Sequence, residues 1–448
     1  MSVRTYQCPC CGAPLQYAGD VGKLHCASCG NSFDPADVQA LQGVGGESDI
    51  GFDRPEEGFT REELESIRAY VCQNCGARLM TEATTTATCC AYCGSPAVLA
   101  DAIEAGVRPQ RVVPFRVSAE EAEAAFHGYF TGKRLLPNVF LKTRNRIAEM
   151  RRLYVPYWLF DCAASARITF DARRSRSIRQ GDWMIVRTDH FLVQRAGSMR
   201  FAGIPVDGSE KLDNRITESL EPYDLTAAVP FQPAVLAGAM ADRADVDAAA
   251  CEARAAERVA ASMESALRST VVGYTSVTAR QRSVHSDQGH VTPALMPVWL
   301  ITTEKEEKGG TRTYTFAING QTGRLTCDVS YDRGKAAAWY AGIFAPSFAL
   351  GLGILAFLNG RGALPQGEGN ATGLLIVAGI ALVLALAVVG SMKAKLKTAK
   401  FQSDAAGYGL NETFQLSLRE DRFLYTTETR HRIAQQNNNT RAPMQKGR

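Results

Sequence analysis

The chain has 448 residues, of which 46% are hydrophobic and 21% are charged, and its formal net charge at pH 7 is only +4. This length is too great for one compact domain and is enough for two or three. The small net charge excludes a protein that is basic over its whole surface, as many nucleic-acid binders are, so the placement of the charges matters more than their sum.

The cysteines are concentrated near the start of the chain, where ten of the 13 lie before residue 94. Paired Cys-x-x-Cys units in such a cluster point to metal binding in a reducing compartment rather than to disulfides. The residues before Cys8 are polar and do not form a secretory signal. We therefore expect the N-terminal part of the chain to stay in the cytosol.

Two cysteine modules follow the same pattern, with 14 residues between the two Cys-x-x-Cys pairs of each. A glycine follows the second cysteine of every pair and permits the tight approach of backbone to sulfur. Four thiolates suit tetrahedral Zn²⁺ and leave no position for a catalytic water, so we predict two structural zinc ions. The predicted ligands are Cys8, Cys11, Cys26 and Cys29 in the first module and Cys72, Cys75, Cys90 and Cys93 in the second.

Two further cysteines, Cys10 and Cys89, adjoin predicted ligands. They are open to three interpretations: exchange with a neighbouring ligand, a redox role, or incidental residues of the pairs. The repeated spacing and the following glycines favour the last. His25 adjoins Cys26 and is an alternative zinc ligand, but the four cysteines already suffice to complete the site. The isolated cysteines at positions 162, 251 and 327 are expected to be small core residues.

The stretch from Asp34 to Ser66 holds ten acidic and two basic residues together with several glycines, which is typical of a flexible linker. Thr60 and Glu63 form a capping-box pattern at its end, so we expect a short helix there.

The middle of the chain alternates helix and strand patterns and predicts an α+β domain. Ser118 and Glu121 form a second capping box, and the Ala-rich segment Asp247–Ser269 predicts a helix. Apolar or alternating segments predict strands at Leu153–Phe160, Val271–Thr278 and Leu295–Thr303, a β-meander from Thr313 onward, and two short strands at Phe414–Leu418 and Phe423–Thr427.

Two charge-free runs near the C-terminus, Ala336–Leu358 and Ala371–Ser391, contain 23 and 21 residues. About 20 helical residues cross a bilayer, so each run predicts a transmembrane helix, with a pair of buried core helices as the alternative. Lysines and arginines flank the outer ends of the two runs, whereas the connector holds only Arg361. The positive-inside rule therefore places both termini in the cytosol. The runs contain no ionisable residue, which favours an anchor over a transporter.

Charge also bears on what the cysteine modules bind. Neither module has a cluster of lysine and arginine, and the linker between them is acidic. Phosphate binding depends on such clusters, so a protein partner is favoured over nucleic acid.

We find no catalytic motif. His285, Asp287 and His290 lie in a segment that we interpret as a solvated polar loop, with a metal or acid–base pair as the alternative. No small-molecule substrate is indicated, and we expect a protein that is not an enzyme.

Several segments together resemble the bacterial YdjG-like family of membrane zinc-ribbon proteins, also described as TFIIB-type zinc-ribbon proteins and often mislabelled as primosomal helicase. The segments are the doubled Cys-x-x-Cys-Gly motif, Val113–Phe115, Tyr154–Phe160, Ile204–Ser209, Leu220–Tyr223, Met296–Leu300 and Phe316–Gly323. The resemblance implies work beside SPFH-domain, TPM-domain and phage-shock-protein-A-like proteins in envelope stress or membrane organisation.

The predicted architecture is multidomain: two small β zinc ribbons, a middle α+β domain and a C-terminal two-helix transmembrane hairpin. The predicted parts are ribbon 1 at 1–35, an acidic linker at 36–68, ribbon 2 at 69–100, the α+β domain at 101–332, transmembrane helices at 336–358 and 371–391, and a basic cytoplasmic tail at 392–448. The first hypothesis for function is an adaptor that recruits protein partners at the cytoplasmic membrane. The alternative is a membrane-tethered nucleic-acid-binding regulator.

Overall fold

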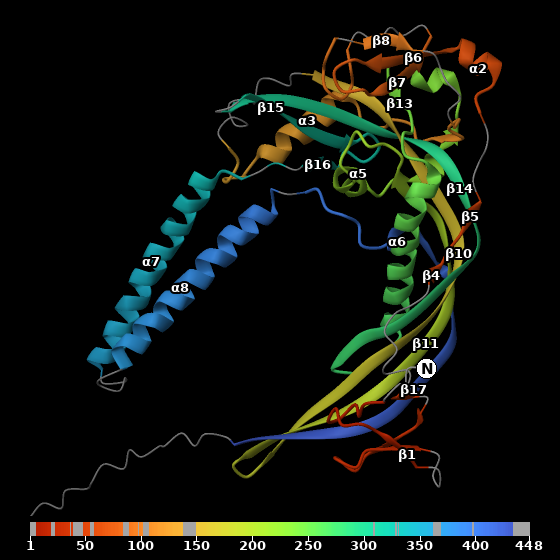
Figure 1. Ribbon diagram of the computed structural model, residues 1–448. Coiled ribbons are helices and arrows are strands. Elements are labelled where there is room, and N and C mark those ends of the chain that lie inside the picture. The colour runs from red at the N-terminus through yellow and green to blue at the C-terminus, as the bar shows by residue number, and fades with distance from the viewer. Residues whose placement is uncertain are drawn as a thin grey trace, which may run out of the picture.

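The structure is a computed structural model of the chain (Figure 1). It describes residues 6–18, 23–35, 37–38, 48–53, 58–83, 89–96, 98–101, 107–137, 149–307, 310–327, 329, 331–361, 369–396 and 398–432. These residues form the helices and strands of the fold.

The first module is a small unit with its own three-stranded antiparallel sheet. Its strands are β1 (Gln16–Ala18), β2 (Lys23–His25) and β3 (Ser32–Phe33). Its buried core consists of Cys8, Leu24, Cys26, Phe33 and Val38. A core of this size is too small to hold a fold by hydrophobic burial alone, so the cysteine cluster has to supply the rest.

The second module, in contrast, is part of the main sheet, in which the described residues contribute 14 strands. Its own strands are β6 (Ile67–Cys72), β7 (Arg78–Glu82) and β8 (Val98–Asp101). Strand β7 pairs with β13 (Met240–Asp242), which in turn pairs with the central strand β10. The second module therefore continues the sheet of the body.

Four long antiparallel strands form the blade of the molecule (Figure 1). In spatial order they are β14 (Ser276–Glu307), β10 (Glu149–Gln180), β11 (Trp183–Asp207) and β17 (Gly409–Arg432). At about 3.3 Å per residue, the 32 residues of β10 extend roughly 100 Å. The upper end carries most of the remaining elements, and the lower end finishes in the β10–β11 turn.

Helix α6 (Ala248–Ser269) covers one face of this blade. Alternate residues of β10 from Trp158 to Ala172 are buried on that face, and most are alanine, isoleucine or phenylalanine. Because side chains alternate between the two faces of a strand, the residues between them point to the other face, where Ser165 and Arg167 are exposed. The predicted helix Asp247–Ser269 is confirmed, with Asp247 as its cap, which accepts a hydrogen bond from the Ala250 backbone at 2.7 Å.

Short elements build the upper end of the body, and the first two of them pair with the middle of β14. They are β4 (Ser48–Asp49), β5 (Phe52–Asp53), α2 (Arg61–Glu65), β9 (Arg111–Val112), α3 (Ala119–Phe130), α5 (Asn214–Leu220), β12 (Val229–Pro230), β15 (Gly310–Asn319) and β16 (Leu325–Cys327), with 3-10 turns at Leu225–Ala227, Pro233–Leu236 and Ala406–Tyr408. Helix α3 packs over β15 through Phe126, whose ring lies 5.1 Å from that of Phe316. The predicted capping boxes at Thr60 and Ser118 are both confirmed.

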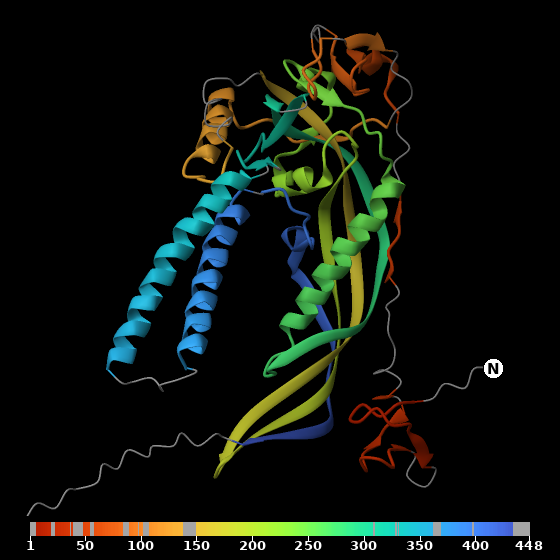
Figure 2. The same cartoon turned by 60° about the vertical axis from the view of Figure 1, so that its left-hand side comes forward.

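Two helices, α7 (Arg333–Gly360) and α8 (Gly369–Ala394), form an antiparallel hairpin. Within the described residues they are the two helices that are long and apolar enough to cross a membrane. They pack closely on each other, since a Cβ atom at Gly351 would lie 2.4 Å from Val377 Cγ1. Figure 2 shows that the hairpin meets the rest of the molecule at its base and stands away from α6.

The chain that leaves α8 is fastened to α5 and α6 by hydrogen bonds. Arg254 of α6 pairs with Glu218 at 2.8 Å and also donates to the Gln402 carbonyl at 2.7 Å. Arg258 is fully buried against Glu221 at 2.6 Å. A buried pair of this kind is costly to break because removal of one partner leaves an uncompensated charge. The exit of the hairpin is thereby linked to the helix that covers the blade.

The structure corrects four predictions of local structure. The short strands predicted at Phe414–Leu418 and Phe423–Thr427 are parts of the single strand β17. The segment with His285 and His290, predicted as a polar loop, lies within β14, and β14 begins at Ser276 rather than at Val271. The predicted acidic linker is ordered in part, because β4 and β5 pair with β14 and the Phe52 ring lies 4.8 Å from that of Phe160.

Candidate metal centres

The four Cys-x-x-Cys turns share one local geometry. In each, the backbone N–H of the glycine donates to the carbonyl of the first cysteine at 2.8–3.0 Å. The glycines at positions 12, 30, 76 and 94 have φ between 68° and 75°, a left-handed conformation that a side chain disfavours. This turn points both sulfurs of a pair to one side, which explains why a glycine stands at each of these positions.

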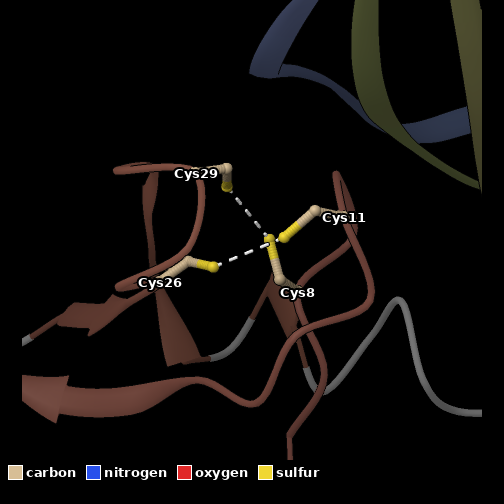
Figure 3. Close-up of side chains that lie close together, drawn as sticks. All are labelled: Cys8, Cys11, Cys26 and Cys29. Carbon is tan, nitrogen blue, oxygen red and sulfur yellow. Dashed lines mark hydrogen bonds between the residues drawn. The ribbon is translucent and has the colours of Figure 1, made fainter.

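In the first module the two turns bring four sulfurs together (Figure 3). Cys8 Sγ lies 3.5 Å from Cys29 Sγ, and Cys11 Sγ lies 3.5 Å from Cys26 Sγ. All four sulfur atoms lie within 4.8 Å of one another. Cys8 and Cys26 are buried, whereas Cys11 and Cys29 are exposed.

The second module repeats this arrangement. Cys72 Sγ lies 3.6 Å from Cys93 Sγ, and Cys75 Sγ lies 3.6 Å from Cys90 Sγ. These four sulfur atoms also lie within 4.8 Å of one another. Cys72 and Cys90 are buried, and the other two are half-buried, so this cluster is less open to solvent than the first.

Both clusters fit a tetrahedral metal ion. With a Zn–S bond of about 2.3 Å, the edge of a sulfur tetrahedron is about 3.8 Å, close to the distances between these sulfur atoms. Each four-cysteine group can therefore hold one metal ion, in agreement with two zinc sites. Four protein ligands close the coordination sphere, so such an ion would fix the fold and would have no open position for a substrate.

Hydrogen bonds prepare one thiol of each cluster for the metal. A hydrogen bond from the Asn31 backbone is the main cause that lowers the pKa of Cys29 to about 6. Burial raises the pKa of Cys93, but hydrogen bonds from the Ser95 backbone and the Asn74 amide outweigh it and bring that pKa to about 7. Burial raises the pKa of Cys8 and Cys90. Metal uptake therefore releases protons and is favoured by higher pH.

The remaining cysteines and histidines lie outside these clusters. Cys10 accepts a hydrogen bond from the Asn31 amide at 3.3 Å, and His25 is bonded to Ser32 at 3.1 Å. The cysteines at 162, 251 and 327 are buried, as predicted for core residues. Cys89 is half-buried beside Cys90.

The second module is held to the body by buried polar contacts that the sequence analysis missed. Tyr92, between two of the ligands, donates its hydroxyl to Asp242 Oδ2 at 2.5 Å, and Ser209 donates to the same oxygen at 2.6 Å. Arg151 of β10 donates to the carbonyl of Cys90. Tyr92 and Asp242 are 150 positions apart, so no local pattern could have revealed the pair.

Asp242 is the most unusual of these groups because it is 2% exposed. Burial raises its pKa to about 7, although hydrogen bonds from Ser209 and Tyr92 act in the opposite direction. It lines one side of a cavity of about 370 Å³, together with Trp158 and Asp245. Asp245 accepts a hydrogen bond from the Glu210 backbone at 2.8 Å. Asp247, the third carboxylate in the lining, accepts from the Ala250 backbone, so all three carboxylates have structural hydrogen bonds.

The first module touches the body through a smaller contact with β17. The rings of Phe33 and Tyr425 meet edge to face at 6.1 Å, and the Tyr425 hydroxyl donates to the Pro9 carbonyl at 3.2 Å. Arg422 forms an ion pair with Asp37. A cavity of about 280 Å³ remains between Cys8 and His190 in this contact. The first module is therefore attached by a few side chains rather than by a shared core.

Comparison with known proteins shows that the chain is similar in sequence to a bacterial protein. It is 33% identical over 359 residues to the Bacillus subtilis (strain 168) protein named "Uncharacterized protein YdjG", and the match covers 80% of this chain and 99% of YdjG. The chain belongs to the YdjG family. No family model matches it, and no solved structure matches it. The relative's name assigns no activity, so the function has to be inferred from the cysteine clusters and the hairpin.

Proposed function

We propose that this member of the YdjG family is a membrane-anchored zinc-ribbon adaptor. In this proposal each four-cysteine group holds one structural Zn²⁺, the α7–α8 hairpin spans the cytoplasmic membrane, and the first module recruits protein partners. The observation that carries it is the different attachment of two modules with identical ligand spacing: the second is built into the body, whereas the first is exposed and held by a few contacts with β17.

The surface of the hairpin supports membrane insertion. Leu350 on α7 and Leu375 on α8 are 68% and 71% exposed, and the apolar residues around them are exposed as well. A soluble protein rarely exposes so large an apolar surface unless something covers it. A hydrocarbon core of about 30 Å matches helices of this length, since 20 residues of helix extend about 30 Å.

The base of the hairpin resembles a membrane interface. Lys393 Nζ lies 4.3 Å from the Tyr331 ring centre, and the Arg134 guanidinium lies 5.2 Å from the Trp339 ring centre. Aromatic rings and cations gather at the headgroup level of membranes. The cations at this end, set against the single arginine of the connector, support a cytosolic base and cytosolic termini.

Charge supports a protein partner for the first module. Its described residues carry few cations and offer no cluster of lysine and arginine for phosphate. The partners that we propose are SPFH-domain, TPM-domain or phage-shock-protein-A-like proteins of the same membrane, with a role in envelope stress or membrane organisation.

The test is affinity purification of the full chain from its native membrane, followed by mass spectrometry. We compare wild type with the double variant Cys8→Ser/Cys11→Ser, which removes two ligands of the first module. Cys10→Ser is the matched control because Cys10 lies between them and outside the cluster. We expect the double variant to stay in the membrane and to lose the proposed partners, while the control keeps them.

Equal recovery of partners by both variants would contradict recruitment by the first module. Salt-sensitive binding of DNA or RNA by the wild type, with no such partners recovered, would favour the alternative of a membrane-tethered nucleic-acid-binding regulator. Release of all three proteins from the membrane by alkaline carbonate would contradict the anchor.

A further inference from the structure

The lower end of the blade is a β-turn that projects beyond the body (Figure 1). Gly181 and Asp182 join β10 to β11, and Gln180 pairs directly with Trp183. Gly181 has φ of 58°, which a two-residue turn of this kind requires and which glycine adopts without strain. We call residues 174–189 together with 426–432 the blade tip.

The pairing of strands places three apolar residues of the blade tip on one face, whereas Met184 and Val186 lie on the other. Ile178 is opposite Ile185, and Gln180 is opposite Trp183. Residues that are directly opposite in a sheet share a face, and so do residues two positions apart. Ile178, Ile185 and Trp183 therefore form one apolar patch, in which Ile178 is 56% and Trp183 45% exposed.

Arginines surround this patch on the same face. Arg176 and Arg187 are opposite each other one step above it. On β17, Arg430 is opposite Ile185, and Arg432 is opposite Trp183. The blade tip holds six arginines in all against Asp182, Asp189 and Glu428, so its formal charge is +3, which compares with +4 for the whole chain.

Acidic neighbours offset only part of this charge. Asp189 contacts Arg176 at 3.1 Å and Arg187 at 3.6 Å, and Glu428 lies 3.8 Å from Arg430. Arg432 stands at the end of β17 beside Trp183 and is exposed. The exposed end of the blade thus combines aliphatic side chains, an indole ring and cations.

We propose that the blade tip is a second membrane contact, which inserts Trp183 and Ile178 among anionic lipid headgroups while its arginines bind the lipid phosphates. Tryptophan favours the membrane interface, and cations near an anionic leaflet are attracted to it. Aliphatic side chains gain from contact with acyl chains, whereas contact with the phosphates of a nucleic acid offers them nothing. This combination favours a lipid surface over a nucleic acid.

The blade tip reaches the lipid surface only after a change in the angle between the blade and the hairpin, a step that rests on the proposed anchor. In both views the blade and the hairpin extend from the upper body toward the same end of the picture (Figures 1 and 2). The outer face of the blade is polar, as at Ser165 and Arg167, so the blade itself does not cross a bilayer. The proposal therefore requires the blade to swing away from the hairpin, so that it lies along the membrane surface when the hairpin is inserted.

The test uses the full chain reconstituted into phosphatidylcholine vesicles, with or without phosphatidylglycerol, that contain a brominated phosphatidylcholine as a quencher of tryptophan fluorescence. The difference in quenching between wild type and Trp183→Phe isolates Trp183. Trp158 and Trp299 are 3% and 5% exposed, and Trp339 lies in α7 in both proteins. We expect Trp183 to be quenched with phosphatidylglycerol and much less without it.

The variant Arg430→Gln/Arg432→Gln should lose this quenching, and the matched control Arg167→Gln/Arg200→Gln, which changes exposed arginines in the middle of the same sheet, should keep it. Absence of Trp183 quenching in anionic vesicles would overturn the inference. So would salt-sensitive binding of a single-stranded oligonucleotide that depends on Arg430 and Arg432 and occurs without lipid quenching. Carbonate extraction of the same vesicles tests the hairpin separately, so failure of the anchor and failure of the blade tip give different results.

Discussion

The two cysteine modules have the same ligand spacing and the same turns, yet they are attached to the body differently. The second module shares a sheet and a hydrophobic core with the body, and its Tyr92 donates to a buried carboxylate. The first module has its own small sheet and meets the body through Tyr425 and Arg422. The comparison teaches that a ligand motif predicts a metal site but not its role, which depends on what surrounds the site.

The strongest test of this difference between the modules removes one cysteine ligand from each of them. We expect Cys90→Ser to lower the free energy of unfolding of the body by on the order of 5 kcal/mol, because the cluster and the core that packs on it are lost together. Cys26→Ser should disrupt the first module and leave the main transition unchanged. Thermal unfolding followed by the fluorescence of the buried Trp158 and Trp299 measures both, and equal effects would show that the modules are not different.

The pH dependence of the free energy of unfolding tests whether the buried Asp242 is protonated in the folded protein. Its pKa is raised to about 7 in the folded protein from a usual value of 3.8. The folded state therefore binds the proton more tightly, and the stability that this proton contributes is lost as the pH rises from about 4 to about 7. At about 1.4 kcal/mol per pKa unit, the loss is at most ~4 kcal/mol. Asp242→Asn should remove most of this slope.

The measurement is the melting temperature of wild type and Asp242→Asn at pH 5 and pH 8. We expect the variant to gain stability relative to wild type at pH 8. The amide oxygen of the introduced asparagine can still accept the hydrogen bonds that Ser209 and Tyr92 donate in the wild type. If the difference in melting temperature between the two proteins is the same at pH 5 and pH 8, Asp242 is ionised at both. Other interactions then offset the cost of burying its charge.

A smaller effect is expected from Tyr92→Phe, which removes one hydrogen bond between the second module and the body. Loss of a donor to a buried carboxylate costs about 1–3 kcal/mol. Tyr17→Phe is the matched control, because Tyr17 is a 63% exposed tyrosine of the first module. If chemical denaturation gives the same midpoint for Tyr92→Phe and Tyr17→Phe, the contact with Asp242 does not hold the second module in place.

The smallest effect on global stability is expected from Tyr425→Ala. Its loss removes an aromatic contact worth about 0.5–1.5 kcal/mol from an exposed interface. The first module should then move away from β17, which hydrogen exchange at β1 to β3 and at Leu424–Thr427 would detect as faster exchange. Unchanged exchange at these strands would mean that other contacts attach the module.

The sequence predicted the features that depend on local pattern. The spacing of the cysteines, the glycines after them, the capping boxes at Thr60 and Ser118, and the helix from Asp247 are all readable from neighbouring residues. The two charge-free runs likewise predicted two long apolar helices. Each of these signals lies within about 30 residues of chain.

The blade could not be predicted in this way. The part of β14 around His285 has polar side chains, so it looked like a loop, and only its pairing with β10 makes it a strand. Strand β17 forms because β11, more than 200 positions away, offers it an edge. The contacts of Tyr92 and Tyr425 also join residues far apart in the chain. The attachment of the two modules depends on these distant contacts, which leave no local trace.

The most direct test of the different roles of the two modules follows metal release from the purified full chain with a strong chelator, while zinc and tryptophan fluorescence are recorded together. We predict two zinc ions per chain and two phases: one ion leaves quickly from the more exposed first module without a change in fluorescence, and the second leaves slowly as the body unfolds. A chain that carries no zinc, or that releases both ions in a single phase together with unfolding, would contradict this prediction.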